Sequence, residues 1–282
     1  MSIIKQLIVI LCLMFSMSCY SDVRYHFLSA ATDNDLNKWH PDSQELCYYP
    51  GTDIVSNQAE RVFKEIFSYI APEKELAHAL MNHALKKRVA FCIENRVDGT
   101  RGYYDYRFNV LAIRSSLSFY QKVAIVIHEL RHVVQVGRGF RQSLDYSMNE
   151  MVRMTYAVEA DVQAYSVYFA WRLKEKGRPE LWDELLNFDR YRDIAIVFER
   201  TMMQSGDEIY SLKQAFIQWY ASPWRRANYH QGCCMSYLDS LDESHLIESF
   251  EVLPETYFDQ LCILPDGRNY GCHKTTAIKL SD

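Results

Sequence analysis

The sequence lacks the excess of basic residues that is typical of nucleic-acid-binding proteins. Its 282 residues include 31 Lys and Arg against 36 Asp and Glu, which gives a formal net charge of −5. Because such a chain has no overall positive field to attract phosphates, we expect no nucleic-acid partner. The chain also lacks internal repeats, low-complexity tracts and long linkers, and its length suits one large domain or two small ones.

The sequence also lacks an apolar run long enough to span a bilayer. Leu7–Phe15 is an apolar run of only nine residues, and no later segment approaches the required length. Lys5 precedes this run, and Ser16 and Ser18 follow it at the positions that a signal peptidase reads. We therefore expect residues 1–18 to be a cleaved signal peptide and the protein to be exported. The alternative, a buried N-terminal helix, does not explain these features together.

Cys19 raises the question of a lipid anchor. Cleavage just before a cysteine resembles lipoprotein processing, although Ser16 stands where Leu or Val is usual. Lipidation of Cys19 is the one membrane contact that we consider. Without it, the expected location is the periplasm or the exterior of the cell.

The cysteines do not show the C-x-x-C pairs of a zinc ribbon. An even number of cysteines in an exported chain favours disulfides. Because Cys233 and Cys234 are adjacent, we expect them to pair elsewhere, with Cys262 and Cys272 as the near candidates, which leaves Cys47 with Cys92. The six cysteines beyond Cys19 are Cys47, Cys92, Cys233, Cys234, Cys262 and Cys272.

The order of the expected elements shows no alternating βαβ pattern. We expect an α+β fold that is mostly helical, in which a small strand-containing N-terminal portion packs on a helical core. A single domain over residues 19–282 would include a cysteine-containing C-terminal segment from about residue 223. The periodicities predict helices over 57–70, 73–87, 118–136, 143–176, 179–204 and 207–221, strands over 88–94 and 103–114, and irregular structure over 20–55 and after 223.

The segment His128-Glu129-Leu130-Arg131-His132 is the strongest chemical motif of the chain. On a helix, histidines four residues apart project from one face, so both imidazoles can bind one zinc ion. Glu129 lies beside that face and can act as a general base toward water at the metal. The motif H-E-x-x-H on a helix is a known pattern of zinc metalloproteases.

The helix around the motif argues against the simpler interpretation that these are ordinary core histidines. The apolar residues Val123, Val126, Ile127, Leu130, Val133 and Val134 form one stripe at helical spacing. His128 and His132 lie on the opposite side, with Ala124, Gln121 and Gln135, so they are not on the most strongly buried face. The remaining alternative is a solvated polar face that carries the motif by chance.

A catalytic zinc site needs a third protein ligand and one open position. The residues after His132 do not continue as H-x-x-G-x-x-H, so the ligand should come from a later helix. Glu150, Glu159 and Asp161 are the acidic candidates over 143–176. All three flank the apolar stripe of that helix, and periodicity does not choose among them.

The chain resembles the gluzincin class of zinc metallopeptidases, over about residues 100–170. It is especially similar to poorly characterised bacterial metallopeptidases with a H-E-L-R-H core. In that class a Glu on a following helix is a ligand and often opens an E-x-x-x-(D/E) segment. By this resemblance the segment from Glu159 supplies the third ligand, 27 positions beyond His132. Gln163 or Asp161 would orient a zinc-binding histidine.

Two residues depart from the pattern of the class. Arg131 is charged at a place where many members have an uncharged residue, and Gln163 replaces the commoner carboxylate. Both departures bear on the rate of catalysis more than on zinc binding. The resemblance also implies that the strand at 103–114 forms the edge of the cleft, where an extended peptide adds to it. An ordinary core strand is the alternative.

Tyr229 and His230 are our candidates for stabilising the transition state, because a donor should lie opposite Glu129. An aromatic-rich surface turn explains that segment equally simply. We expect one zinc ion on His128, His132 and Glu159, with peptides or proteins as substrates. The alternatives are a non-catalytic exported protein that binds zinc or a partner, and a zinc amidase acting on cell-wall peptides.

Overall fold

The computed structural model describes residues 46–51, 57–95 and 101–272. The expected signal peptide at 1–18 and Cys19 lie outside the described residues. Four short strands form one sheet in the order β1-β2-β4-β3, with β2 and β4 parallel and the other two pairs antiparallel. The strands are β1 (Cys47–Tyr48), β2 (Ala90–Glu94), β3 (Gly102–Asp105) and β4 (Val110–Arg114).

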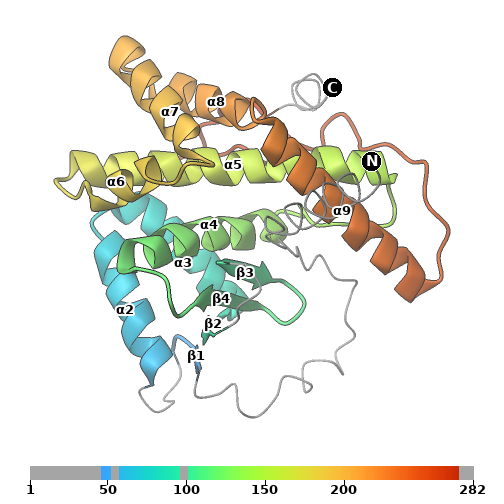
Figure 1. The fold of residues 1–282 in the computed structure, drawn as a ribbon, viewed down its shortest axis with the longest axis horizontal. Helices are drawn as coiled ribbons and strands as arrows, with labels where there is room; N and C mark the ends of the chain where they lie inside the picture. Colours follow the sequence, from blue (N-terminus) through green and yellow to red (C-terminus); the bar gives the residue numbers. More distant parts are fainter. Residues whose placement is uncertain (1–45, 52–56, 96–100, 273–282) are drawn as a thin grey trace, which may run out of the picture.

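Helices make up most of the described structure, which confirms the expected mostly helical α+β fold. In Figure 1 the sheet lies below α4 and α5 lies above α4. Helices α7 and α8 lie above α5, whereas α9 crosses α5 in this view and contacts it. Within the described residues, no helix combines the length and apolar character that crossing a bilayer requires. The helices are α2 (Gln58–Ile70), α3 (Lys74–Lys87), α4 (Phe119–Gly137), α5 (Met148–Glu175), α6 (Glu180–Leu186), α7 (Arg192–Ser205), α8 (Glu208–Trp219) and α9 (Pro223–Ser244).

Helices α4 and α5 form the centre of the molecule. Ser118 begins α4 with a reciprocal capping box to Gln121, and Ser147 caps α5 through the N–H of Glu150. The predicted apolar stripe of α4 is buried, as expected, but so are Glu129, Arg131 and Gln135. The reason is that α5 covers a second side of α4. The polar side of α4 is therefore an interior surface, not the solvated face considered as the alternative.

The prediction of one continuous strand over 103–114 was wrong, because residues 106–109 form a turn that divides it into β3 and β4. The Asp105 carboxylate accepts hydrogen bonds from the N–H groups of Arg107 and Phe108, and Asn109 has a left-handed φ of 56°. Both features favour a turn. The strand β3 lies at the edge of the sheet, next to α4.

Two helix predictions were also wrong. The helix expected over 179–204 is divided into α6 and α7 by residues 187–191, where the Phe188 and Tyr191 rings stack at 5.3 Å. The segment after Pro223, expected to be irregular, begins with the 22-residue helix α9. Pro223 occupies the first turn of that helix, where its missing N–H costs nothing, and Ser222 caps it.

Two disulfides connect described cysteines. The pair Cys47–Cys92 joins β1 to β2 and confirms the expectation. The second pair is Cys262–Cys272, so the expected pairing of these residues with Cys233 and Cys234 was wrong. The chain turns back between Ile263 and Asn269, which brings the two ends of that loop together. Cys233 is instead buried on α9, against the core.

Candidate metal centre

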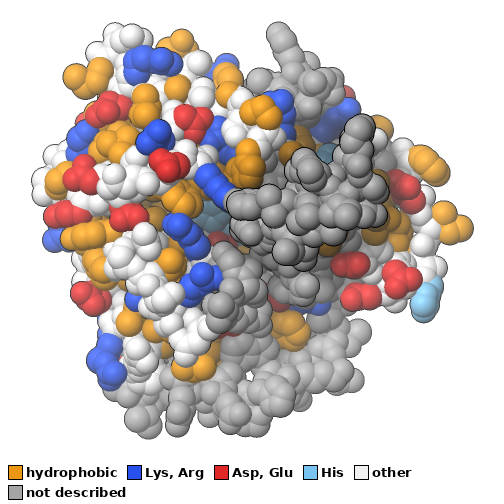
Figure 2. Space-filling view, viewed as in Figure 1, with side chains coloured by type: hydrophobic (Ala, Val, Ile, Leu, Met, Phe, Trp, Pro, Cys, Tyr) orange, Lys and Arg blue, Asp and Glu red, His pale blue; other side chains and the backbone are white. Residues whose placement is uncertain are grey.

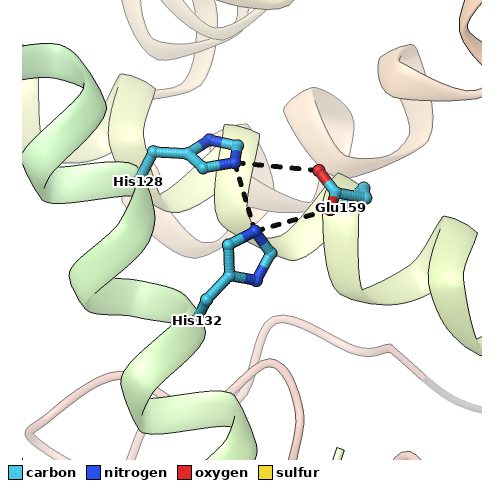
Figure 3. A group of neighbouring side chains, drawn as sticks. All are labelled: His128, His132 and Glu159. Carbon is cyan, nitrogen blue, oxygen red and sulfur yellow. Dashed lines mark hydrogen bonds and ion pairs between the residues drawn. The ribbon is translucent and has the colours of Figure 1, made fainter. Parts of the chain in front are cut away.

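His128 and His132 face each other on adjacent turns of α4. Their Nε2 atoms are 3.2 Å apart, and each side chain is about one-sixth exposed, at 15% and 16%. Glu159 reaches them from the middle of α5 (Figure 3). Its two carboxylate oxygens lie 3.8 Å from Nε2 of His128 and 3.4 Å from Nε2 of His132. Two consecutive helices, α4 and α5, therefore bring two nitrogens and a carboxylate to one point, as a metal ligand set requires.

The surroundings of Glu159 fit a bound cation. Its side chain is fully buried, and neither oxygen has a hydrogen-bond partner of ordinary geometry among the described residues. Burial raises the pKa of Glu159 to about 8, and the approach of the Tyr229 hydroxyl only partly offsets this. A buried carboxylate with so little hydrogen bonding is unfavourable, and a metal cation held between it and the imidazoles would offset that penalty.

The two histidines are held in the form that binds metals. Burial lowers the pKa of His132 to about 4 and that of His128 well below its usual range, so both imidazoles are neutral at pH 7. For His128 the charge of His132 adds to this effect, whereas the hydrogen bond to Gln135 opposes it for His132. Neutral imidazole nitrogens are metal ligands, and protonated ones are not.

Gln135 fixes the tautomer of His132. Its Nε2 donates to the Val158 carbonyl at 2.9 Å and to Asp161 at 2.6 Å, which orients the amide. Its Oε1 lies 2.8 Å from Nδ1 of His132 and can therefore accept the Nδ1 proton. The lone pair of Nε2 is then free to face the metal position. Sequence reasoning placed Gln135 beside the histidines but gave it no role.

Gln163 has the equivalent position at the other histidine, as the resemblance implied. Its Nε2 lies 3.2 Å from Nδ1 of His128. Rotation of the amide by 180° would place its oxygen there, ready to accept the Nδ1 proton. Each histidine thus has a glutamine at the nitrogen that faces away from the metal position.

Glu129 is buried next to the same site. Burial raises the pKa of its carboxyl group well above the usual range, and the charge of Glu159 raises it further. The backbone N–H of Tyr104, on the edge strand β3, acts in the opposite direction. Glu129 therefore lies between the candidate ligands and the edge strand.

Comparison with known families decides how this site is classified. The model of the family described as "Putative metallopeptidase family (DUF6782)" matches residues 40–272, which is most of the chain. The chain belongs to this family. Comparisons with curated proteins and with solved structures found no match. Membership in the metallopeptidase family indicates a metal-dependent protease that acts on peptides or proteins, and the His-His-Glu group is where a metal can bind.

Glu150 and Asp161, the other two candidates for the third metal ligand of this metallopeptidase, are paired with other groups. Glu150 contacts Arg153 and accepts a hydrogen bond from the N–H of Leu253. Asp161 is fully buried and forms a two-point ion pair with Arg131, with both N–O distances at 2.9 Å. Arg131 also donates to the Leu261 carbonyl at 3.0 Å. The structure thus brings Glu159 to the histidines and assigns Arg131 to a buried ion pair.

Tyr229 and His230, the two residues expected to stabilise the transition state, are neighbours on α9, but one is buried and the other is exposed. Tyr229 is buried, approaches Glu159, and has its hydroxyl 3.0 Å from that of Tyr191. His230 is exposed, and its ring lies 3.7 Å from the Cys234 sulfur on the same helix. The structure therefore brings Tyr229 to the candidate metal centre and leaves His230 outside it.

Proposed function

We propose that this protein is an exported zinc-dependent metallopeptidase of the gluzincin type. The observation that carries the proposal is the convergence of His128, His132 and Glu159, with both Glu159 oxygens buried and without ordinary hydrogen bonds. Two neutral imidazoles and one carboxylate are the ligand set of catalytic zinc in several hydrolases. Zinc held there would supply Lewis acidity toward the scissile carbonyl and toward a water molecule.

The protein's own groups account for the proton transfers. Glu129 accepts a proton from the attacking water and later donates it to the leaving amine. Its raised pKa, caused by burial and by Glu159, suits a group that must hold this proton between the two steps. Tyr229 donates a hydrogen bond to the oxyanion that develops on the substrate carbonyl, and Tyr191 orients the Tyr229 hydroxyl.

The edge strand β3 gives the substrate a place to bind. No described strand pairs with its outer side, and Tyr104 on this strand contacts Glu129. An extended peptide that adds to β3 through backbone hydrogen bonds therefore passes the site with its peptide bonds in reach of Glu129.

Metal analysis and metal removal test this function. We expect one equivalent of zinc in the purified protein, and cleavage of a peptide library that a chelator abolishes and added zinc restores. His128→Ala should lose the metal, whereas His78→Ala, which changes an exposed histidine on α3, should keep it. Bound zinc without any peptide cleavage would favour a non-catalytic protein, and cleavage restricted to cell-wall peptides would favour an amidase.

Export is part of the proposal and rests on two features. The N-terminal residues have the pattern of a signal peptide. The disulfides Cys47–Cys92 and Cys262–Cys272 suit an oxidising compartment. The intact mass of the mature protein should correspond to a chain that begins after Ser18, with added lipid mass if Cys19 is acylated. A mature chain that retains residues 1–18 would contradict the signal peptide.

A further inference from the structure

The Cys262–Cys272 disulfide closes a loop near the C-terminus that has no role in the mechanism above. We call residues 261–272 the disulfide loop. The two sulfurs are ten positions apart in sequence, and within the loop the Tyr270 N–H donates to the Cys262 carbonyl at 3.1 Å. Cys262, Cys272 and Tyr270 are all buried. The disulfide loop therefore packs into the interior of the protein.

The disulfide loop contacts both members of the buried ion pair behind the candidate metal centre. The Tyr270 hydroxyl donates to Asp161, and a carboxylate oxygen of Asp161 lies within 4.8 Å of both sulfurs. Arg131, the other member of the pair, donates to the Leu261 carbonyl at 3.0 Å. Figure 2 shows acidic and basic side chains interspersed over the described surface of one face, as is usual for solvated charges. This pair, in contrast, is enclosed by the protein and by the disulfide loop.

Asp161 connects the disulfide loop to the candidate metal ligands. It accepts a hydrogen bond from Nε2 of Gln135 at 2.6 Å, and Oε1 of the same amide lies 2.8 Å from Nδ1 of His132. Asp161 also follows Glu159 by two positions on α5. A displacement of Asp161 would therefore change the amide that orients one ligand and the helix that carries another.

Reduction of the disulfide would displace these groups. Two sulfurs bonded at about 2 Å must move apart when they become thiols, and a close-packed interior has no spare room for the movement. The loop would also lose its covalent closure. The Tyr270 hydroxyl and the Leu261 carbonyl both belong to this loop, so Asp161 would lose a donor and Arg131 an acceptor.

We propose that closure of the Cys262–Cys272 disulfide completes the metal centre, so that the oxidised protein binds zinc more tightly than the reduced protein. The proposal rests on the metallopeptidase function proposed above and adds its regulation. In the closing step, the two thiols lose two electrons and two protons to an oxidant that carries a disulfide and becomes a dithiol. In an exported protein this step follows entry into an oxidising compartment, so tight zinc binding would begin there.

Zinc affinity, measured by competition with a fluorescent chelator, tests the proposal without reference to activity. Cys262→Ser/Cys272→Ser should bind zinc about 10-fold more weakly than the oxidised protein, since groups that orient metal ligands typically contribute this much. Cys47→Ser/Cys92→Ser is the matched control. It removes the disulfide between β1 and β2 and should leave the zinc affinity unchanged. A disulfide that only stabilised the fold would change the melting temperature of the metal-free protein but not its zinc affinity.

Tyr270→Phe tests the contact between the loop and Asp161 while the disulfide stays closed. It removes only the hydroxyl that donates to Asp161, so zinc binding should weaken in the same direction as in the serine variant. Tyr257→Phe makes the same chemical change where the ring packs on Phe140 and Tyr146, and should have no effect. Unchanged zinc affinity in Tyr270→Phe would overturn the proposed route through Asp161.

A redox titration of the wild-type protein covers the case in which the serine variants do not fold. Glutathione redox buffers, alkylation and mass spectrometry follow each disulfide separately, with and without a fixed concentration of free zinc. Because coupling is reciprocal, a tenfold tighter affinity of the oxidised form shifts the Cys262–Cys272 midpoint in saturating zinc by about 30 mV to more negative potential. The Cys47–Cys92 midpoint should not move.

The outcomes distinguish failure of this proposal from failure of the peptidase function. An unmoved Cys262–Cys272 midpoint, or one that rises because the reduced thiols bind zinc, would overturn the coupling. If the protein also binds zinc and cleaves peptides, the peptidase function stays intact. A wild-type protein that takes up no zinc in its oxidised form would overturn both.

Discussion

Replacing Glu129 by glutamine should leave the metal in place and lower kcat by about 10²- to 10⁴-fold. The two side chains have nearly the same shape, so the site around position 129 should keep its geometry. The candidate metal ligands are His128, His132 and Glu159, and Glu129 is not one of them. A glutamine amide, however, cannot accept the proton of the attacking water, so only this step is lost.

Zinc content, circular dichroism and peptide cleavage should be measured together on Glu129→Gln. Glu75→Gln is a suitable control, because it makes the same chemical change at an exposed position on α3. Near wild-type cleavage by Glu129→Gln would refute the proposed general base. Loss of zinc from this variant would instead make Glu129 a ligand.

The helical core could be predicted from the sequence because its signals are local. The apolar stripe of α4, its start at Ser118 and the four-residue spacing of the histidines all belong to one helix. The strand predicted over 103–114 was wrong because local hydrogen bonds of the Asp105 carboxylate form a turn within an alternating pattern. Helix α9 was not predicted because Pro223 can either end a helix or begin one, and the sequence alone did not distinguish the two.

The third ligand could not be chosen by periodicity, because α5 is covered on nearly every side. Glu150, Glu159 and Asp161 are all buried, so burial does not distinguish them. The distinction comes from their partners, which lie on other elements: Arg153 and the Leu253 N–H for Glu150, and Arg131 for Asp161. Glu159 faces the histidines, as the resemblance to gluzincins implied.

Arg131 shows why a departure from a family motif must be interpreted in three dimensions. Its position inside H-E-x-x-H suggested an effect on catalysis, but its side chain turns toward Asp161 and the C-terminal segment. Asp161 in turn accepts hydrogen bonds from Gln135 and from the Tyr270 hydroxyl. Because Gln135 orients His132, the Arg131–Asp161 ion pair supports a candidate metal ligand. The same ion pair holds the segment that contains the Cys262–Cys272 disulfide.

Arg131→Met should therefore lower the free energy of unfolding by about 3–5 kcal/mol, because it leaves the Asp161 charge buried without its cation. Urea denaturation of the metal-free protein measures this loss without a contribution from metal binding. Arg138→Met is a matched control. Arg138 donates to backbone carbonyls of the same segment, with the Gln260 oxygen at 3.0 Å, and its loss should cost only about 1 kcal/mol.

The double variant Arg131→Met/Asp161→Asn tests whether the instability of Arg131→Met comes from the unpaired charge of Asp161 or from the loss of side-chain contacts. Asparagine has one acceptor oxygen, which can accept from the Tyr270 hydroxyl or from Gln135 but not from both, and it removes the charge that Arg131 neutralises. If the unpaired charge causes the instability, the double variant should be more stable than Arg131→Met alone, since two changes in contact are not additive. A double variant as unstable as the sum of the two single variants would contradict this explanation and would leave packing of the Arg131 side chain on the Tyr165 ring, at 4.4 Å, as the cause.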